Sequence, residues 1–235
     1  MIFFYQYILI HMIQSLLSKW KNTTILPLFL SQLIVLIFVI LPFSYNSDFL
    51  QLLFTYVLAF NVLLGVYATK TSNRIKYFTI FLSIIVLSLN FFDGSNFDNH
   101  FIKYVALTCW ISLIGLLLLV FILKTFSSSD NSFHKIQGGI ACYLIIGLLF
   151  TYIHLLILFV QPNSYMFNNN LDSHNHITFQ INYFSFTTLT TTGYGDITPI
   201  KPVAQTVTLL EEVIGVLFPA VFIGYLVSIA TNKTT

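Results

Sequence analysis

The chain has 235 residues, of which 57% are hydrophobic and only 8% are charged, and its formal net charge is +2. A water-soluble fold cannot carry that much apolar surface, and so small a net charge does not suggest binding to nucleic acid. We therefore expect an all-α membrane protein. Both cysteines, Cys109 and Cys142, fall inside predicted spans. This favours free thiols packed as small hydrophobes over a disulfide or a metal site.

The chain begins with an apolar stretch, Met1–Leu17, that is interrupted by polar residues and is followed by Lys19 and Lys21. We assign residues 1–24 to an N-terminal segment that is either an interfacial helix or an additional span. No positively charged region precedes the apolar stretch, so a cleavable signal peptide is not expected.

Six longer apolar stretches follow, and each is near or above the roughly 20 residues that a helix needs to cross a bilayer. They are Ile25–Leu41, Phe49–Ala68, Ile75–Phe92, Phe101–Leu123, Ile136–Val160 and Val203–Ala230. The first four predict a four-span bundle at residues 25–123. A cytoplasmic linker at 124–135 and a second domain at 136–235 complete the expected organisation.

The charges between these spans and at their ends predict the orientation in the membrane. One side holds Lys19, Lys21, Lys70, Arg74, Lys76, Lys124, Lys135 and Lys233. The opposite loops hold Asp48, Asp93, Asp98, Asp172 and Asp196, with Lys103 and Lys201 as their cations. The positive-inside rule then places both termini in the cytoplasm. A seventh span at the start would move the N-terminus outside.

Between the last two spans lies a short apolar stretch, Ile181–Leu189, which runs into the threonine-rich sequence that ends at Gly193-Tyr194-Gly195-Asp196. The stretch is too short to cross a bilayer, so we expect a re-entrant helix. An extended loop can line a pore with backbone carbonyls if successive residues alternate in handedness. Gly193 and Gly195 can take positive φ at little cost because they have no Cβ, and the ring of Tyr194 is expected to brace the loop.

The segment from Gln180 to Leu226 resembles the pore module of the potassium channel family, with a pore helix, a Thr-x-Gly-Tyr-Gly filter and an inner helix. The resemblance implies a selectivity filter at Thr191, Thr192, Gly193, Tyr194, Gly195 and Asp196. It also implies K⁺ sites formed by the carbonyls of Thr191, Thr192, Gly193 and Tyr194, together with the Thr191 hydroxyl. Thr187 and Thr188 support the filter from the pore helix.

Two positions depart from the family pattern. Thr192 stands where Val or Ile is frequent, and its hydroxyl needs a partner behind the filter. Tyr183 and Phe184 stand where many members have two tryptophans, and Tyr183 is able to bond Asp196 at the outer mouth. Since one filter cannot encircle an ion, a closed ring of identical subunits is required, and the family implies a tetramer.

The last span contains candidate gating residues. Gly215 lies where the family has a hinge glycine, and Pro219 removes the helical hydrogen bond to the Gly215 carbonyl. The pair is either a hinge or a static bend with close packing. Glu211 and Glu212 point about 100° apart, so we expect one to bond the back of the pore helix and the other to lie near the cavity. The alternative is that both are interfacial.

The fourth span has Lys103 at one end and no further charge within it. Strong voltage gating is therefore not expected, because each charge moved contributes only about 2.3 kcal/mol per 100 mV. The first four spans are interpreted as a passive scaffold or as a sensor for lipid or a small ligand. His174 and His176 fall in an outer loop, where a solvated loop is favoured over a metal site or a pH sensor.

Together these features predict a multi-pass plasma-membrane protein that conducts K⁺ passively with weak or no voltage dependence. The alternatives are a less selective monovalent cation channel and a non-conducting accessory membrane subunit. An enzyme is not expected, because no metal cluster, nucleophile pair or phosphate loop shares one membrane face. We expect no cofactor beyond K⁺ as permeant ion, and as partners only further copies of the chain and membrane lipids.

Overall fold

The computed structural model describes residues 25–37, 48–68, 72–93, 100–127, 132–167 and 177–231. Its elements are α2 (Ile25–Val35), α4 (Asp48–Ala68), α5 (Asn73–Asp93), α6 (His100–Ser127), α7 (Ser132–Val160), β1 (Tyr165–Phe167), α8 (Ile177–Leu189), β2 (Ile197–Pro199) and α9 (Pro202–Thr231). The described chain is mostly helical, as its composition predicts. The predictions for residues 1–24 and for His174 and His176 lie outside the described residues.

Three described helices are long and apolar enough to cross a membrane, namely His100–Phe126, Phe133–Val160 and Pro202–Thr231. Shorter apolar stretches lie at Leu26–Val35 and Leu53–Tyr67. The described chain thus has the helices of a membrane protein, and the prediction of six spans is supported for three of them.

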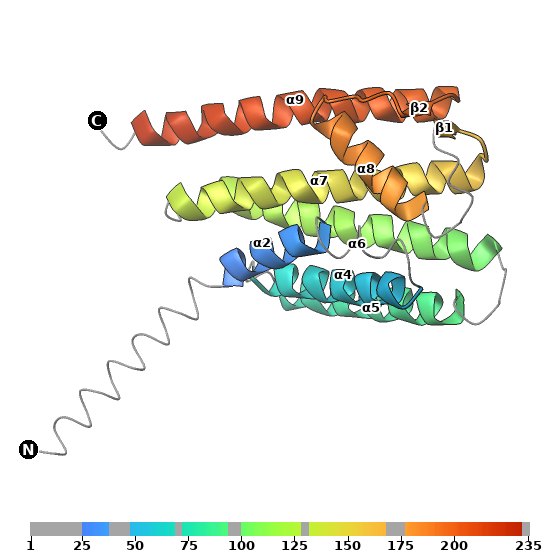
Figure 1. Ribbon diagram of the computed structural model, residues 1–235. Helices are drawn as coiled ribbons and strands as arrows, with labels where there is room; N and C mark the ends of the chain where they lie inside the picture. Colours follow the sequence, from blue (N-terminus) through green and yellow to red (C-terminus); the bar gives the residue numbers. More distant parts are fainter. Residues whose placement is uncertain are drawn as a thin grey trace, which may run out of the picture.

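The long helices lie roughly side by side across the molecule, but not in chain order, because α2 contacts α7 as well as α4 (Figure 1). The helix α9 lies along one side, α7 and α6 lie in the middle, and α2, α4 and α5 form the opposite side. The short helix α8 crosses obliquely between α7 and α9 and contacts both. This is the expected arrangement of a re-entrant helix held between two spanning ones. It begins at Ile177, four residues before the predicted start at Ile181.

The largest apolar core joins the first helices to the pore-side helix α7. It includes Phe29 of α2, Leu58 of α4, Ile114 of α6 and Ile145 of α7, each at most 1% exposed. Gly65 allows α4 to approach α2, because a Cβ there would lie 2.8 Å from Cε2 of Phe29. The core therefore runs across the predicted boundary between the four-span bundle and the second domain, and most of the predicted linker is helical in α6 and α7.

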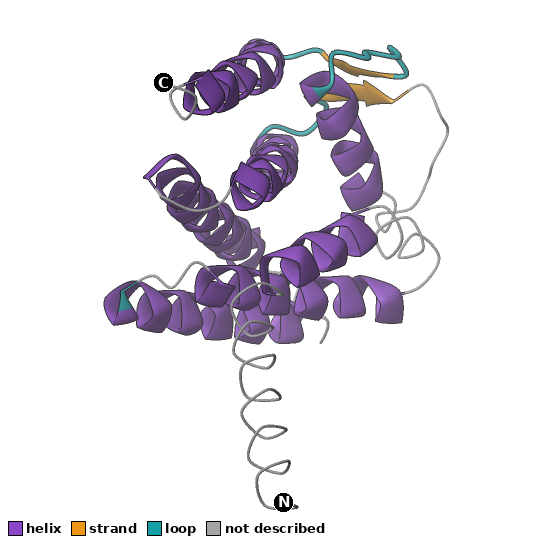
Figure 2. Ribbon diagram, turned by 90° about the vertical axis from the view of Figure 1, so that its left-hand side faces the viewer, coloured by secondary structure: helices purple, strands orange, loops and turns teal. Residues whose placement is uncertain are grey.

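A two-stranded antiparallel ribbon was not predicted from the sequence. Tyr165 of β1 pairs with Pro199 of β2, and Phe167 pairs with Ile197. Figure 2 shows the two strands beside α8, at the end of the molecule where α9 begins. The ribbon ties the chain after α7 to the chain after the filter, and Tyr165 is 3% exposed.

Candidate pore and selectivity filter

The backbone after α8 alternates in handedness. Positive φ occurs at every second residue, with values of 57° at Thr191, 53° at Gly193 and 77° at Gly195. The two glycines take this conformation at little cost, as their lack of Cβ predicts. Thr191 is a β-branched residue for which positive φ is a strained conformation.

The strain at Thr191 has a local cause, which is the way α8 ends. The Thr192 amide donates to the Thr187 carbonyl at 2.8 Å, and the Thr191 amide donates to the Thr188 carbonyl at 2.8 Å. These two bonds form a Schellman motif, in which the residue after the helix takes a left-handed conformation. Thr187 and Thr188 therefore hold the start of the Thr191–Asp196 segment through their carbonyl groups, and this segment begins within the cap of α8.

The filter presents unpaired acceptors. Within the described part of the chain, the carbonyl oxygens of Thr191, Thr192, Gly193 and Tyr194 accept no hydrogen bond. All four residues are exposed in the single subunit. A row of free, exposed carbonyls on an extended loop is able to replace the water around a dehydrated cation.

The side chains of the filter are held by neighbours on the same subunit. Thr192 Oγ1 lies 2.9 Å from Thr190 Oγ1, which supplies the partner that its hydroxyl requires. The Tyr194 ring stacks on the Tyr183 ring with an interplanar angle of 4° and a centroid distance of 6.1 Å. Partial desolvation, followed by a hydrogen bond and a charge from Asp196, raises the pKa of Tyr183 above its usual value. Tyr183 thus joins α8 to Tyr194 and Asp196 at the end of the Thr191–Asp196 segment.

Gly215 is the point at which the inner helix α9 meets the end of the pore helix. It is buried, and a Cβ built on it would lie 2.8 Å from the Leu189 carbonyl carbon and closer still to the carbonyl oxygen. That oxygen accepts a hydrogen bond from the Tyr143 hydroxyl of α7 at 3.1 Å. Of the two interpretations of Gly215, this geometry favours close packing. Pro219 lies four residues later within a helix that runs unbroken to Thr231.

A buried network of hydrogen bonds links α7, α8, α9 and β1. Glu211 of α9 is 0% exposed, and its Oε1 lies 2.5 Å from Ser185 Oγ of the pore helix. Its Oε2 lies 2.8 Å from Nε2 of His154 on α7. Nδ1 of the same histidine lies 2.6 Å from the Tyr165 hydroxyl of β1. Glu211 thus bonds the back of the pore helix, as expected for one of the two carboxylates.

In this hydrogen-bond network, the direction of one hydrogen bond determines the direction of the next. A neutral His154 has one ring N–H, so donation from Nε2 to Glu211 leaves Nδ1 to accept from Tyr165. Ser185 has one hydroxyl proton and two acceptors in reach, Glu211 and the Gly147 carbonyl at 2.8 Å. Burial, with the nearby Glu211 as a smaller cause, raises the pKa of the Tyr165 phenol. The network therefore fixes the orientation of one side chain on each of three helices and one strand.

Glu212 has a different environment from Glu211, because it is exposed on the single subunit. The same face of α9 exposes the large apolar residues Leu209, Leu210, Val213, Val216 and Leu217, each more than half exposed. A helix with so much apolar surface uncovered needs lipid or another protein surface against it.

The opposite end of α9 is tied to the chain that enters the pore domain. Lys135 at the start of α7 is 7% exposed, and its Nζ donates to the Tyr225 hydroxyl of α9 at 3.1 Å. The Tyr225 hydroxyl in turn donates to the Phe126 carbonyl of α6 at 2.9 Å. We call these three residues the Lys135–Tyr225–Phe126 latch. It connects three helices in the last third of α9, beyond Pro219 from the Thr191–Asp196 segment.

The sequence interpretation did not include His154, Ser185, Tyr165 or Tyr225. A histidine inside an apolar span was a usable signal, because an ionisable residue in a membrane helix usually has a named partner and a role. Ser185 and Tyr165 gave no such signal, since hydroxyl residues are common in helices and loops.

Comparison with known proteins agrees with this geometry. A family model described as an ion channel matches residues 140–232, which contain most of α7, all of α8, the Thr191–Asp196 segment and α9. No curated protein and no solved structure matches the chain. The matched region and the three long apolar helices indicate a membrane protein with an ion channel domain, which points to transport of ions rather than to catalysis.

Proposed function

We propose that the protein is a potassium-selective channel in which four copies surround one pore. The observation that carries the proposal is the filter backbone, with positive φ at Thr191, Gly193 and Gly195 and free carbonyls from Thr191 to Tyr194. In a ring of four, each level of carbonyls contributes four oxygens around the axis. Asp196 and the stacked Tyr183 and Tyr194 then hold the outer mouth.

The assembly is supported by the exposed apolar face of α9. A single filter loop cannot enclose an ion, and the same helix that positions the loop leaves Leu209, Val213 and Val216 uncovered. Closed symmetric rings satisfy both needs, because each copy covers the face of the next. We place the channel in the plasma membrane with both termini in the cytoplasm, six spans per subunit and membrane lipid around the ring.

Gating is assigned to the inner helix. Pro219 removes one helical hydrogen bond and Glu212 lies on the exposed face of α9, whereas Gly215 and Glu211 anchor the same helix to the pore helix. In this proposal the part of α9 near the filter stays fixed, and the part beyond Pro219, which contains Tyr225, moves. We propose weak or no voltage dependence, since α6 carries Lys103 and Lys124 near its ends and no charge between them.

The test is ion flux into liposomes that contain the purified protein, first under a K⁺ gradient and then under a Na⁺ gradient. Wild type is expected to pass K⁺ and to exclude Na⁺. Gly193→Ala and Gly195→Ala should abolish selective flux while the assembly persists, because alanine disfavours positive φ although its Cβ would meet nothing within 4 Å in the subunit. Gly224→Ala is the matched control, since Gly224 lies in regular helix with open space around it.

The outcomes separate the alternatives. Equal passage of K⁺ and Na⁺ in wild type would indicate a less selective cation channel. An intact assembly with no flux of either ion would indicate a non-conducting accessory subunit. If both filter variants kept wild-type selectivity, the filter assignment would be wrong.

A further inference from the structure

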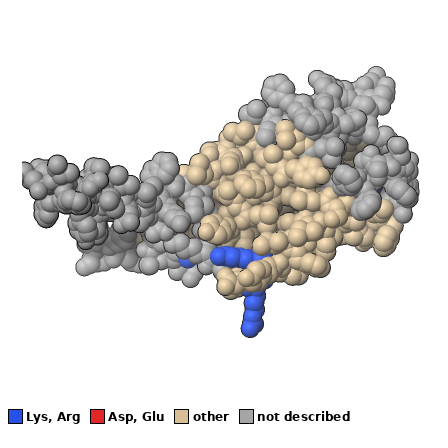
Figure 3. All heavy atoms as spheres, turned by 90° about the horizontal axis from the view of Figure 1, so that it is seen from below, with Lys and Arg blue, Asp and Glu red and all other residues tan. Residues whose placement is uncertain are grey.

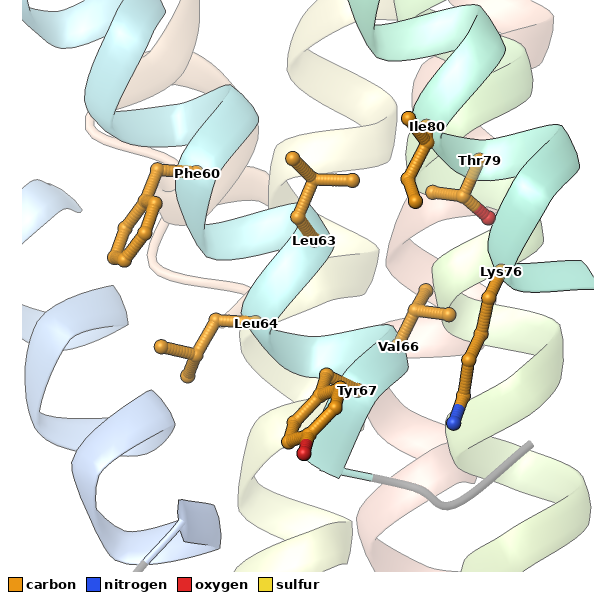
Figure 4. A pocket seen from close by; sticks show the side chains of 8 residues that line it. All are labelled: Phe60, Leu63, Leu64, Val66, Tyr67, Lys76, Thr79 and Ile80. Atoms are coloured by element: carbon orange, nitrogen blue, oxygen red, sulfur yellow. The ribbon is translucent and has the colours of Figure 1, made fainter. Parts of the chain in front are cut away.

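A groove of about 340 Å³ lies between α4 and α5, on the side of the molecule away from the pore helix. Among the residues that line it are Phe60, Leu63, Leu64, Tyr67, Lys76 and Ile80. The close view in Figure 4 shows Leu63 and Val66 of α4 on the side of Lys76, Thr79 and Ile80 of α5, and Phe60 and Leu64 on the other side of α4. Its volume is within the range of about 300–1,000 Å³ that small-molecule sites occupy.

The groove has one charged group, and it lies at one end. Lys76 is in the first turn of α5 and is half-buried, and its Nζ lies 5.3 Å from the centre of the Tyr67 ring near the end of α4. Figure 4 shows the ammonium group beside the Tyr67 end of the groove, with the aliphatic residues beyond it. None of the lining residues is acidic. A ligand that fits must therefore be apolar along its length and anionic at one end.

The surface around the groove suits a membrane ligand. Phe60, Tyr67 and Ile80 are 55%, 62% and 43% exposed, so the groove opens among apolar side chains. On this face of the described chain, Figure 3 shows basic side chains at one end and no visible acidic ones. The positive-inside rule places that end at the cytoplasmic leaflet, where anionic lipids are concentrated.

We propose that this groove binds an anionic phospholipid of the cytoplasmic leaflet. One acyl chain lies between α4 and α5 along Leu63 and Ile80, and the phosphate accepts a hydrogen bond from the Lys76 ammonium. The site is separate from the pore, and only its assignment to the cytoplasmic leaflet depends on the proposed topology. Lipid binding would give α4 and α5 a specific role that their apolar composition by itself does not indicate.

The test measures lipid retained by the full-length protein after purification in a neutral detergent, using native mass spectrometry. The added probes are phosphatidylglycerol and phosphatidylcholine with the same acyl chains. High ionic strength, at which the Debye length falls towards about 3 Å, removes diffuse attraction to exposed charges. Wild type is expected to retain phosphatidylglycerol in preference to phosphatidylcholine. Lys76→Gln should lower that retention about tenfold, as expected for loss of a hydrogen bond to a charged group, and Lys76→Arg should preserve it.

Matched variants distinguish binding in the groove from nonspecific effects of charge and side-chain size. Arg74→Gln removes the same charge two residues away, at an exposed position that does not line the groove, and should change retention less than twofold. Leu63→Trp fills the groove and should lower retention, whereas Leu53→Trp makes the same change at an exposed position of α4 outside it. Gel filtration checks that every variant assembles as wild type does.

Three results would overturn the proposal. They are no preference for phosphatidylglycerol in wild type, equal losses in Lys76→Gln and Arg74→Gln, and competition by glycerol phosphate as effective as that by the whole lipid. The last result would show that the groove itself is not occupied. Because retention is measured by mass, a protein that binds lipid but conducts no ion would contradict the proposed function and leave this site standing.

Discussion

Replacing Gly215 by alanine tests whether the inner helix is hinged or packed at this point. If Gly215 only supplied flexibility, alanine would stiffen α9 and raise its helix propensity by about 1 kcal/mol. The structure predicts instead that alanine at this position destabilises the protein. The new Cβ would lie 2.8 Å from the Leu189 carbonyl carbon and 3.1 Å from its Cα, and these are backbone atoms that cannot rotate away.

The expected loss of stability can be estimated from the displacement of the Leu189 backbone. Overpacking in a buried contact costs about 1–3 kcal/mol. Displacing the Leu189 carbonyl also strains its hydrogen bond from the Tyr143 hydroxyl, and an unsatisfied buried group costs a further ~1–3 kcal/mol. After the gain in helix propensity, the net destabilisation is about 1–5 kcal/mol in each subunit. Because Leu189 lies two residues before Thr191, the displacement reaches the filter.

The assay compares Gly215→Ala with Gly224→Ala in thermal unfolding of the assembled protein and in K⁺ and Na⁺ flux. Gly224 is on the same helix, and a Cβ there would meet nothing within 4 Å, so its variant reports helix propensity without a clash. We expect Gly215→Ala to unfold at lower temperature and to lose selective flux, and Gly224→Ala to retain both. If the two variants behave alike, the packing argument is wrong and Gly215 acts through flexibility.

Three further predictions follow from the same contacts. Glu211→Gln should destabilise the assembly by about 1–3 kcal/mol through its lost bonds. Glu212→Gln makes the same charge change at a position that is exposed on the subunit surface and has no side-chain hydrogen bond within the described part of the subunit, and it should stay within about 0.5 kcal/mol in thermal unfolding. Tyr225→Phe breaks the Lys135–Tyr225–Phe126 latch and should change the open probability in single-channel recording, while an altered preference between K⁺ and Na⁺ would contradict this assignment. Neutralising Lys103 should barely change open probability across a voltage ramp, and a steep conductance–voltage curve in wild type would show that the fourth span was misinterpreted.

The sequence by itself determined the local features of this protein. Helical membrane segments follow from long apolar runs, because a bilayer leaves backbone groups no other way to be satisfied. The positive φ values at Gly193 and Gly195 follow from residues that lack a Cβ. The short helix before the filter follows from an apolar stretch too brief to span. These properties depend on neighbouring residues only, so they can be read in chain order.

The tertiary structure decided what residues far apart in the chain do together. His154 and Glu211 are 57 positions apart, and only the packing of α7 against α9 brings their side chains to 2.8 Å. Gly215 has two interpretations in sequence, and the approach of the Leu189 backbone distinguishes them. The same holds for Lys135, which the charge pattern counts as a loop cation and the fold buries against Tyr225. Such contacts depend on how helices cross, and the hydrophobic periodicity of one helix does not show which other helix packs against it.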